Sequence, residues 1–373
     1  MSKKKLGAFS LTEIAMDKPT SITSEGKLIF PKEVHEKKSL ALNTLISLDD
    51  SLKIKLTEAR IKAETDFKLG IIGLGSYSKK EVLENVLNQT ELGELVTRAE
   101  MNYCDEFNMQ LRNPVTRLPV EPVVKVQKTV IPKEIRGIHS AIRPIFRSTA
   151  LFCENTTDSL TNLAATYRKA KVHPVFVAQG FNVKVLEGVN DVRYYFHQEA
   201  IKRCVVYISG VGHGSPTVYT GHLGDPVLRV GYYDAADVNG KVIHLLSCQT
   251  AKTLGPDMIT KGAKSYFGYF ENFIFNYDQS STSVNELELF WKCDSEIDIC
   301  MALGTTCEAA HNAAIAKYNW AIAQVPNTST AVNLTHDRNY LRDAKIGASY
   351  GSKTKKISKY CIPYAVAVNP IVR

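Results

Sequence analysis

A histidine and a cysteine, each placed after an apolar segment, are the residues of this sequence best suited to chemistry. The run Tyr207–Val211 leads to His213, and the run Ile243–Leu246 leads to Cys248, 35 positions after the histidine. An imidazole beside a thiol can accept its proton and later protonate a leaving group, which is the minimum equipment for thiol nucleophilic catalysis. The pair therefore predicts Cys248 as a nucleophile and His213 as its general base and acid. Buried packing is the alternative for either residue taken alone.

Two neighbouring parallel strands would bring this pair together, because the carboxyl ends of parallel strands share one edge of a sheet. Gly214 follows the histidine directly, so a substrate carbonyl could approach its backbone N–H. With the N–H of Cys248, this group would form an oxyanion hole, an element that contributes about 3–4 kcal/mol in comparable hydrolases. His222 and His244 are interpreted as structural.

Residues 147–373 alternate strand-like and helix-like segments. Such alternation predicts an α/β domain in which helices cover both faces of a mostly parallel sheet. The expected strands are 149–153, 175–178, 204–209, 242–247 and 265–270, the expected helices are 159–171, 192–202, 254–261, 283–293 and 306–324, and a last apolar run covers 361–368.

Residues 1–111 are expected to form a separate helical domain. Apolar residues recur at spacings of three and four over 32–47 and 52–69, and Ser78 with Glu81 makes a capping box that opens a further helix. The segment Gly70–Gly75 imitates a dinucleotide-binding loop but lacks the full glycine pattern. It is interpreted as a turn between helices, with nucleotide binding as the alternative.

Residues 112–146 form a basic, proline-rich segment that we interpret as a linker between the two domains. Five of the fourteen prolines lie here, and residues 112–147 contain eight Lys or Arg residues but only two glutamates. An accessible basic segment is also suited to cleavage, so self-processing within 112–147 is a second hypothesis. Most of the net charge of +8 lies in this segment, which has one aromatic residue. Direct nucleic-acid binding is therefore not favoured.

The composition places the chain among globular proteins and excludes several classes. Of its 373 residues, 44% are hydrophobic and 23% charged, and no apolar run approaches the length of a membrane span. Glu13 and Asp17 interrupt the segment after the basic start, which argues against a secretory signal. The eight cysteines lack metal-ligand spacing and contain no C-x-x-C, so a reduced, cytoplasmic setting is expected, with no metal or organic cofactor.

The two reactive segments resemble the signatures of a known group of enzymes. Ile208–Gly214, followed by Leu245–Ala251, resembles the His-Gly and Ser-x-Cys-type signatures of clan CD cysteine peptidases, which include caspases, gingipains, separase and the CHAT proteases. Gly262–Tyr269 resembles the segment that follows the cysteine in gingipain-like and CHAT members. The caspase pentapeptide Gln-Ala-Cys-x-Gly is absent and the His–Cys gap is short, so the CHAT or gingipain-like branch is the better match. The resemblance covers about residues 147–350.

The resemblance implies a caspase-like three-layer α/β/α sandwich over residues 147–373 and a cysteine endopeptidase acting through a thioester. It assigns catalysis to His213 and Cys248, the oxyanion donors to Gly214 and Cys248, and requires no third catalytic residue. Pocket carboxylates for a basic P1 side chain would come from Asp257, Glu271 or Asp278, each of which is also typical of a plain surface position. A protein substrate, a regulatory partner bound by the N-terminal helices and a role in bacterial defence are expected. The rival interpretation is a catalytically silent caspase-like scaffold.

Overall fold

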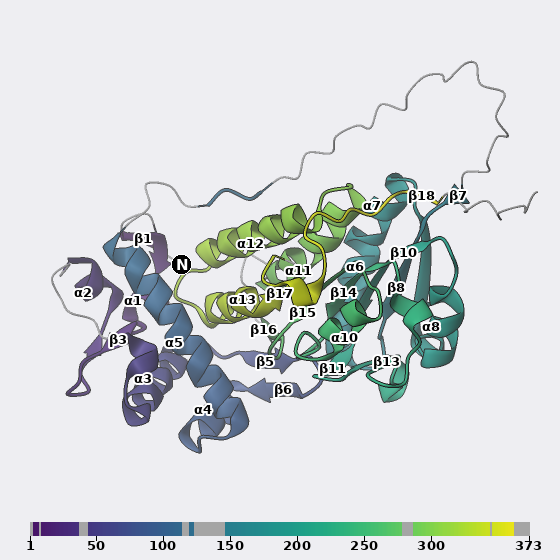
Figure 1. The fold of residues 1–373 in the computed structure, drawn as a ribbon. Helices are drawn as coiled ribbons and strands as arrows, with labels where there is room; N and C mark the ends of the chain where they lie inside the picture. Colours follow the sequence, from purple (N-terminus) through teal and green to yellow (C-terminus); the bar gives the residue numbers. More distant parts are fainter. Residues whose placement is uncertain are drawn as a thin grey trace, which may run out of the picture. The chain divides into compact units, whose positions relative to one another are not determined.

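The computed structural model describes residues 3–6, 9–36, 44–113, 119–122, 146–277, 286–343 and 345–361. The chain divides into two compact units, and each is described by itself (Figure 1). The first unit comprises residues 1–122, 269–296 and 312–341; the second comprises 123–268, 297–311 and 342–373. The first unit is thus assembled from three separated stretches of chain. Most of the expected linker, residues 112–146, lies outside the described residues, and so does most of the segment in which self-processing was expected.

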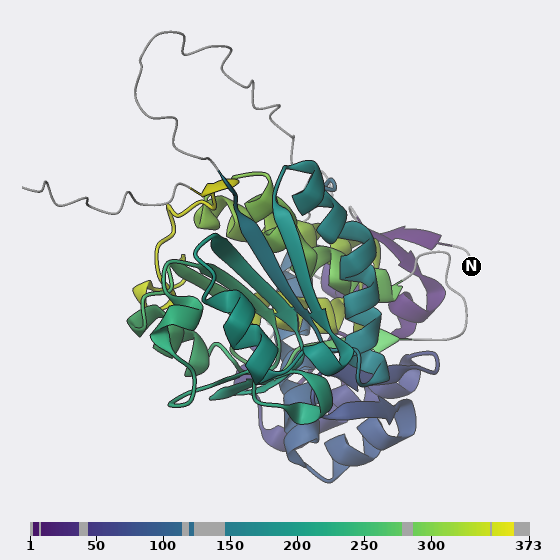
Figure 2. The same cartoon turned by 90° about the vertical axis from the view of Figure 1, so that its right-hand side faces the viewer.

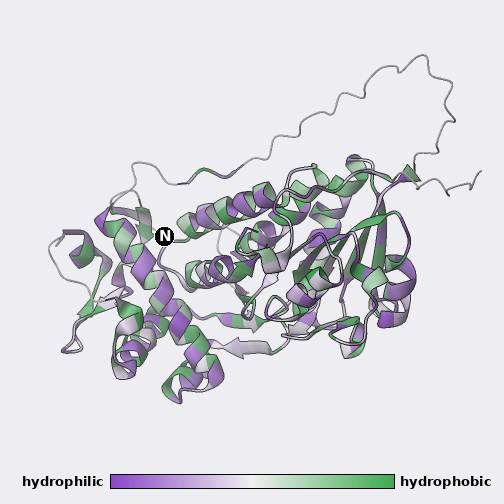
Figure 3. Cartoon of the chain, in the orientation of Figure 1, coloured by the Kyte–Doolittle hydropathy of each residue, from purple (hydrophilic) through white to green (hydrophobic). Residues whose placement is uncertain are grey.

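The largest sheet has six strands, in the order β17-β15-β14-β10-β8-β9. The neighbours β9, β8, β10, β14 and β15 are all parallel, as the sequence predicted. Every residue of β14 and β15 is buried, which is typical of strands covered on both faces. Figure 3 shows strands β8 and β10 of the same sheet coloured mostly as apolar. The bounds are β8 Thr149–Glu154, β9 Asn182–Glu187, β10 Val205–Val211, β14 Val242–Leu246, β15 Ser265–Tyr269 and β17 Leu341–Arg342.

Helices in the connections lie on both sides of this sheet (Figure 2). The chain passes from β8 to β9 through α6 (Ser159–Lys171) and α7 (His173–Ala178), then returns past β8 to β10 through α8 (Arg193–Ala200). These two crossovers run in opposite directions along the sheet. Because parallel crossovers are right-handed, opposite directions place their helices on opposite faces. The mixed α/β architecture predicted from the alternating pattern is therefore present.

Most elements predicted between residues 149 and 270 match the observed ranges to within two residues, and one does not. The helix expected over 159–171 is present, and the strand expected over 149–153 extends by one residue. The strand expected over 175–178 is wrong: these residues belong to α7, which opens with Pro174 in its first turn. A four-residue apolar run does not distinguish strand from helix by periodicity. The strand of this region is instead β9, an edge strand with alternating burial.

A small three-stranded antiparallel sheet follows β10 and begins at His213. It consists of β11 (His213–Ser215), β12 (Val218–Thr220) and β13 (Leu228–Arg229), in that order. The remaining helices that involve this unit are α9 Ala235–Val238, α10 Leu254–Thr260, α11 Glu286–Ala302 and α12 Cys307–Gln324, and a short strand pair joins β7 Phe146–Arg147 to β18 Tyr360–Cys361.

The first unit combines helices with a three-stranded sheet, so its N-terminal part is not wholly helical. The segment Gly70–Gly75, expected as a turn between helices, connects two antiparallel strands, and Gly73 and Gly75 take positive φ. A hairpin lacks the strand-to-helix frame of a dinucleotide loop. The Ser78–Glu81 capping box is confirmed. The unit contains β1 Lys3–Leu6, β2 Phe9–Thr12, α1 Glu13–Asp17, β3 Ser21–Ile22, β4 Leu28–Ile29, α2 Pro31–Glu36, α3 Asp50–Ala63, β5 Lys68–Ile71, β6 Gly75–Ser78, α4 Lys79–Leu87, α5 Glu91–Arg112, β16 Ile274–Tyr277 and α13 Ser329–Tyr340.

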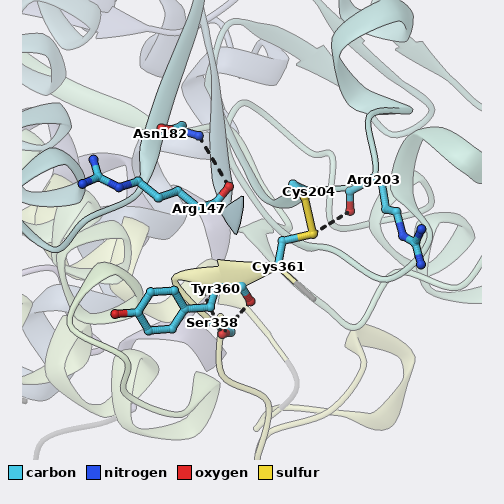
Figure 4. Close-up of a disulfide and its surroundings, with 7 residues drawn as sticks. All are labelled: Arg147, Asn182, Arg203, Cys204, Ser358, Tyr360 and Cys361. Carbon is cyan, nitrogen blue, oxygen red and sulfur yellow. Dashed lines mark hydrogen bonds between the residues drawn. A yellow bond between two sulfur atoms is a disulfide. The ribbon is translucent and has the colours of Figure 1, made fainter. Parts of the chain in front are cut away.

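Two of the eight cysteines form a disulfide, which the expected reduced setting did not anticipate. Cys204 and Cys361 are joined with their Cα atoms 5.4 Å apart (Figure 4). The other six, including Cys248, are buried and lie outside any disulfide. Within the described residues, no helix is both long enough and apolar enough to cross a membrane.

Candidate active site

The register of the sheet brings the two reactive residues to the same place on its edge. Strands β10 and β14 are parallel neighbours, and Val211 pairs with Leu246. His213 and Cys248 each follow two residues after this last pair. Since adjacent strands lie about 4.8 Å apart, the two residues leave the sheet side by side at its carboxyl edge. The arrangement expected from the apolar runs is present.

The glycine after the histidine lies directly against the loop that carries the cysteine. A Cβ atom at Gly214 would fall 2.6 Å from the carbonyl oxygen of Cys248 and would also collide with Oγ of Ser247. Real Cβ atoms do not approach other heavy atoms this closely, so this position has no room for a side chain. The sequence suggested glycine as an opening for substrate. The structure gives it another reason: the two loops touch here.

Asp158, which the sequence did not single out, holds the imidazole of His213. Its Oδ2 lies 2.9 Å from Nε2 of His213. Asp158 is also the N-cap of α6, where its other oxygen accepts the backbone N–H groups of Leu160 and Thr161. An aspartate immediately before a predicted helix is a recognisable cap. Its contact with a residue 55 positions away follows only from the sheet.

Charge and hydrogen bonding fix the ionisation state of Asp158. Partial burial opposes its ionisation, but hydrogen bonds from His213 and Thr161 outweigh that effect and hold the pKa of this carboxyl below its usual range. The carboxylate therefore accepts a hydrogen bond from the Nε2–H of the ring. That tautomer leaves Nδ1 of His213 as the basic nitrogen, and Nδ1 is buried without a hydrogen-bond partner among the described residues.

Exposure differs between the members of the site. The side chains of His213 and Asp158 are 33% and 34% exposed, whereas Cys248 is only 2% exposed. The His213 side chain is therefore partly open to solvent, although its Nδ1 atom is buried. Cys248 is almost completely buried, so a substrate can reach the thiol only if the surrounding chain moves.

The nucleophile loop, residues 247–253, is held in a constrained conformation. Gln249, directly after the cysteine, has a φ of 59°, a left-handed backbone that non-glycine residues adopt at a cost of about 1–3 kcal/mol. Thr250 Oγ1 donates to the carbonyl of Ser247 at 3.2 Å, and the hydroxyl of Tyr266 donates to Thr250 Oγ1 at 2.7 Å. Strained backbone held by side-chain hydrogen bonds is common where a reactive residue must point in one direction.

The position of the site agrees with the general rule for open α/β sheets. Strand β9 lies on one side of β8 and β10 on the other, so the order of the strands reverses between β8 and β10. Ligands bind at the carboxyl edge near such a reversal. Asp158 follows β8, His213 follows β10 and Cys248 follows β14, so three adjacent strands supply the site.

Of the three carboxylates suggested for substrate binding, Asp257 is described within the second unit. Asp257 lies on α10, where it accepts the hydroxyl hydrogen of Tyr233 at 2.6 Å and pairs with Lys261 at 3.2 Å. Its charge is already balanced, so the structure argues against it as an open pocket carboxylate. Glu271 belongs to the first unit, and Asp278 lies outside the described residues.

His222 and His244, the two histidines interpreted from the sequence as structural, each have a partner of their own. His244 is fully buried on β14, with Nδ1 3.1 Å from Oδ1 of Asp298. His222 faces the hydroxyl of Thr157 at 3.1 Å. Both arrangements fit the structural interpretation that the sequence suggested.

A second aspartate that the sequence missed lies beneath the hairpin that carries His213. Asp191 is fully buried, and neither carboxylate oxygen has a hydrogen-bond partner among the described residues. Gly221 packs against it, with only 2.8 Å between its missing Cβ position and the carboxyl carbon. Burial, together with the charges of Glu154 and Asp225, raises the pKa of Asp191 to about 8.

A buried ionic cluster anchors the helix that Asp158 caps. Arg168 on α6 bonds Glu154 at the end of β8 at 3.0 Å and Asp298 on α11 at 2.9 Å, and it donates to Ser209 on β10 at 2.7 Å. Each partner is buried. Breaking such a cluster is costly because it leaves an uncompensated charge. The helix, and with it Asp158, is therefore held firmly to β8 and β10.

One group of side chains in this unit has a spacing that could suit a metal ion. His197, Asp234 and Asp237 bring their ligand atoms within 4.8 Å of one another. The guanidinium of Arg193, however, lies 2.6 Å from Asp237 and 3.6 Å from Asp234. A fixed cation already balances these carboxylates, so the geometry is that of an ion-pair network.

No protein-family model matches the chain, and neither the curated proteins nor the solved structures gave a match. The arrangement of Asp158, His213 and Cys248 is therefore the basis for inferring a function.

Proposed function

We propose that the protein is a cysteine endopeptidase in which Cys248 is the nucleophile and His213 the general base and acid. The observation that carries this proposal is the paired register of β10 and β14. At the carboxyl edge of the sheet these strands lead to His213, which contacts Asp158, and to Cys248. A scaffold that only binds partners would need neither the thiol nor the oriented imidazole.

The chemistry follows from the orientation of the ring. Nδ1 of His213 takes the proton of the Cys248 thiol, and the thiolate attacks the carbonyl carbon of a peptide bond. The imidazolium then gives this proton to the leaving amine, and a thioester remains on the cysteine. Water, deprotonated by the same nitrogen, attacks the thioester and releases the acid product and the thiol. Asp158 stabilises the imidazolium at each stage without changing its own protonation state.

The oxyanion of each tetrahedral intermediate would be bound by the backbone N–H groups of Gly214 and Cys248. The two residues lie against each other in the structure, which supports this assignment. Removal of one such donor typically costs about 3–4 kcal/mol of transition-state stabilisation.

The fold and setting that accompany this proposal are those of a caspase-like protease of the CHAT or gingipain-like branch. The parallel sheet with helices on both faces supports it. We further propose a cytoplasmic protease whose N-terminal part receives a regulatory protein, with a role in bacterial defence. Preference for Arg or Lys at P1 stays a hypothesis. A fluorogenic peptide panel that showed equal or better cleavage after acidic or apolar residues would remove it.

The decisive test compares wild type with Cys248→Ala and His213→Ala. We expect a cysteine-directed peptidase probe to label only the wild type, and new peptide termini to arise in a proteome only with the wild type. Cys300→Ala, which removes another buried thiol, is the matched control and should retain both activities. Equal cleavage by wild type and Cys248→Ala would refute the proposal. Absence of both labelling and cleavage in the folded wild type would favour the silent scaffold.

A further inference from the structure

The segment from Tyr350 to Cys361, called the strap below, begins at the nucleophile loop. The hydroxyl of Tyr350 donates to the carbonyl of Ala251 at 3.0 Å, three residues after the nucleophile. Its ring stacks on Tyr266 with 6.4 Å between centroids, and Tyr266 in turn donates to Thr250. The strap therefore supports the loop by one direct hydrogen bond and one indirect contact.

The middle of the strap is fixed to other parts of the second unit by backbone hydrogen bonds. Ser352 N–H donates to the carbonyl of Lys264 at 2.9 Å. The carbonyls of Lys353 and Lys355 each accept a backbone N–H at 2.8 Å, from Glu308 and Cys307 at the start of α12. These bonds hold the strap against the second unit along the stretch between its two ends.

The far end of the strap is attached where β10 begins. There the two-residue strand β18 pairs with β7, and the carbonyl of Lys359 accepts the N–H of Ser148 at 2.9 Å. A two-residue strand pair is weak by itself. The disulfide from Cys361 to Cys204 adds a covalent link between residues 157 positions apart (Figure 4). Cys204 directly precedes Val205, the first residue of the strand that leads to His213.

We infer that the Cys204–Cys361 disulfide is a redox-sensitive anchor. Through the strap, it holds the nucleophile loop in the conformation in which Cys248 is buried, and Tyr350 is the positioning residue. The disulfide is the covalent element of an otherwise hydrogen-bonded strap, so its reduction would weaken the attachment at one end. The consequence for catalysis rests on the proposed function, whereas the change in the loop does not.

The chemical step is thiol–disulfide exchange with a dithiol reductant. A thiolate of the reductant attacks one sulfur of the pair and expels the other cysteine as a thiolate. The second thiolate of the reductant then attacks the mixed disulfide and releases the first cysteine. Two electrons and two protons pass to Cys204 and Cys361, which become thiols, and the dithiol becomes a disulfide. The side chain of Cys204 is partly exposed, so a reductant can reach this end of the bond.

The first experiment compares the full-length oxidised protein with the double variant Cys204→Ser/Cys361→Ser. Amide hydrogen exchange is measured over 247–254 and 352–361, together with the rate at which iodoacetamide alkylates Cys248. We expect exchange over 356–361 to accelerate about tenfold, which corresponds to a loss of about 1.4 kcal/mol of local stability. Alkylation of Cys248, which is buried, should accelerate about threefold or more as its loop opens. Unchanged exchange over 247–254 together with unchanged alkylation would overturn the inference.

The second experiment tests the positioning role of Tyr350 with a matched substitution. Tyr350→Phe removes the hydroxyl that bonds Ala251, and we expect about fivefold faster exchange over 247–254, the factor that one ordinary hydrogen bond supplies. Tyr360→Phe removes a hydroxyl from the same strap, in a side chain that is 49% exposed, and should leave that exchange unchanged. Equal effects of the two variants would contradict the positioning role.

These measurements do not depend on peptidase activity, so the two proposals can fail separately. A loop that responds to the disulfide in a protein that cleaves no peptide would sink only the proposed function. If the double serine variant does not fold, wild type reduced with dithiothreitol and freed of it under anaerobic conditions replaces it. A protein that cleaves peptides, but whose nucleophile loop exchanges and reacts equally with and without the disulfide, would refute only the anchor role of the disulfide.

Discussion

Replacement of Asp158 by asparagine separates its catalytic role from its role as a helix cap. The side chain accepts two backbone N–H groups at the start of α6 and also contacts Nε2 of His213 at 2.9 Å. Asparagine is as good an N-cap as aspartate, so the first function survives in Asp158→Asn. The negative charge that stabilises the imidazolium of His213 is lost.

The expected loss of activity follows from the energy of a hydrogen bond to a charged group, about 1.5–3 kcal/mol. If that stabilisation is present only when the imidazolium forms, kcat/KM falls about 10- to 150-fold. Stability should fall by less than about 1 kcal/mol, because the pair is one-third exposed and solvent screens it. Asp158→Ala should lose about 1 kcal/mol more stability, because the cap is lost as well.

The pH dependence provides an internal check. The folded-state pKa of Asp158 is depressed, so its contribution to stability is present above the unfolded pKa of about 3.9 and is lost as the pH falls through the folded value. The carboxylate is therefore ionised over the whole range from about pH 5 to 9. Activity lost in Asp158→Asn should not be recovered at any pH in that range.

The assay measures kcat/KM on a fluorogenic peptide together with the alkylation rate of Cys248 as a function of pH. Asp49→Asn is the matched control, since Asp49 caps α3 in the first unit by accepting the N–H of Ser51 at 2.8 Å. The control should match the wild type in both measurements. Activity of Asp158→Asn within twofold of the wild type would refute an orienting role for this carboxylate.

Two further predictions concern the packing and charge around the hairpin that carries His213. Gly214→Ala should displace the nucleophile loop, cost about 1–3 kcal/mol in the free energy of unfolding and abolish probe labelling, since its Cβ would collide with Cys248. Gly347→Ala, where the nearest atom outside its chain neighbours is 3.6 Å from a Cβ, is the control, and equal labelling of the two variants would contradict the packing argument. Asp191→Asn should remove a pH dependence: burial raises the folded-state pKa to about 8, so stability present at acidic pH is lost as the pH rises through that value. Between about pH 6 and 9 the wild type should lose about 2–3 kcal/mol relative to the variant in urea unfolding, and parallel curves would refute the assignment.

The sequence alone was sufficient to predict the core of the large sheet and that His213 and Cys248 follow two of its strands. Buried parallel strands such as β10 and β14 are continuous apolar runs, which local composition reveals. The helix over 159–171 was predicted with its bounds because its apolar spacing is a local signal. Where a local signal was ambiguous, as in the short apolar run at 175–178, the prediction was wrong.

Only the tertiary structure showed which residues act together. Two contacts join parts of the chain that share no local pattern: Asp158 with His213, and Cys204 with Cys361. The burial of Asp191 likewise has no local signal in the sequence. Such contacts depend on strand order and register, and these are decided by how whole elements pack. Local composition therefore predicted that a histidine and a cysteine each follow a buried strand. The fold decided that these strands are neighbours in matching register, that a helix cap orients the histidine, and that a disulfide-bound strap supports the loop of the cysteine.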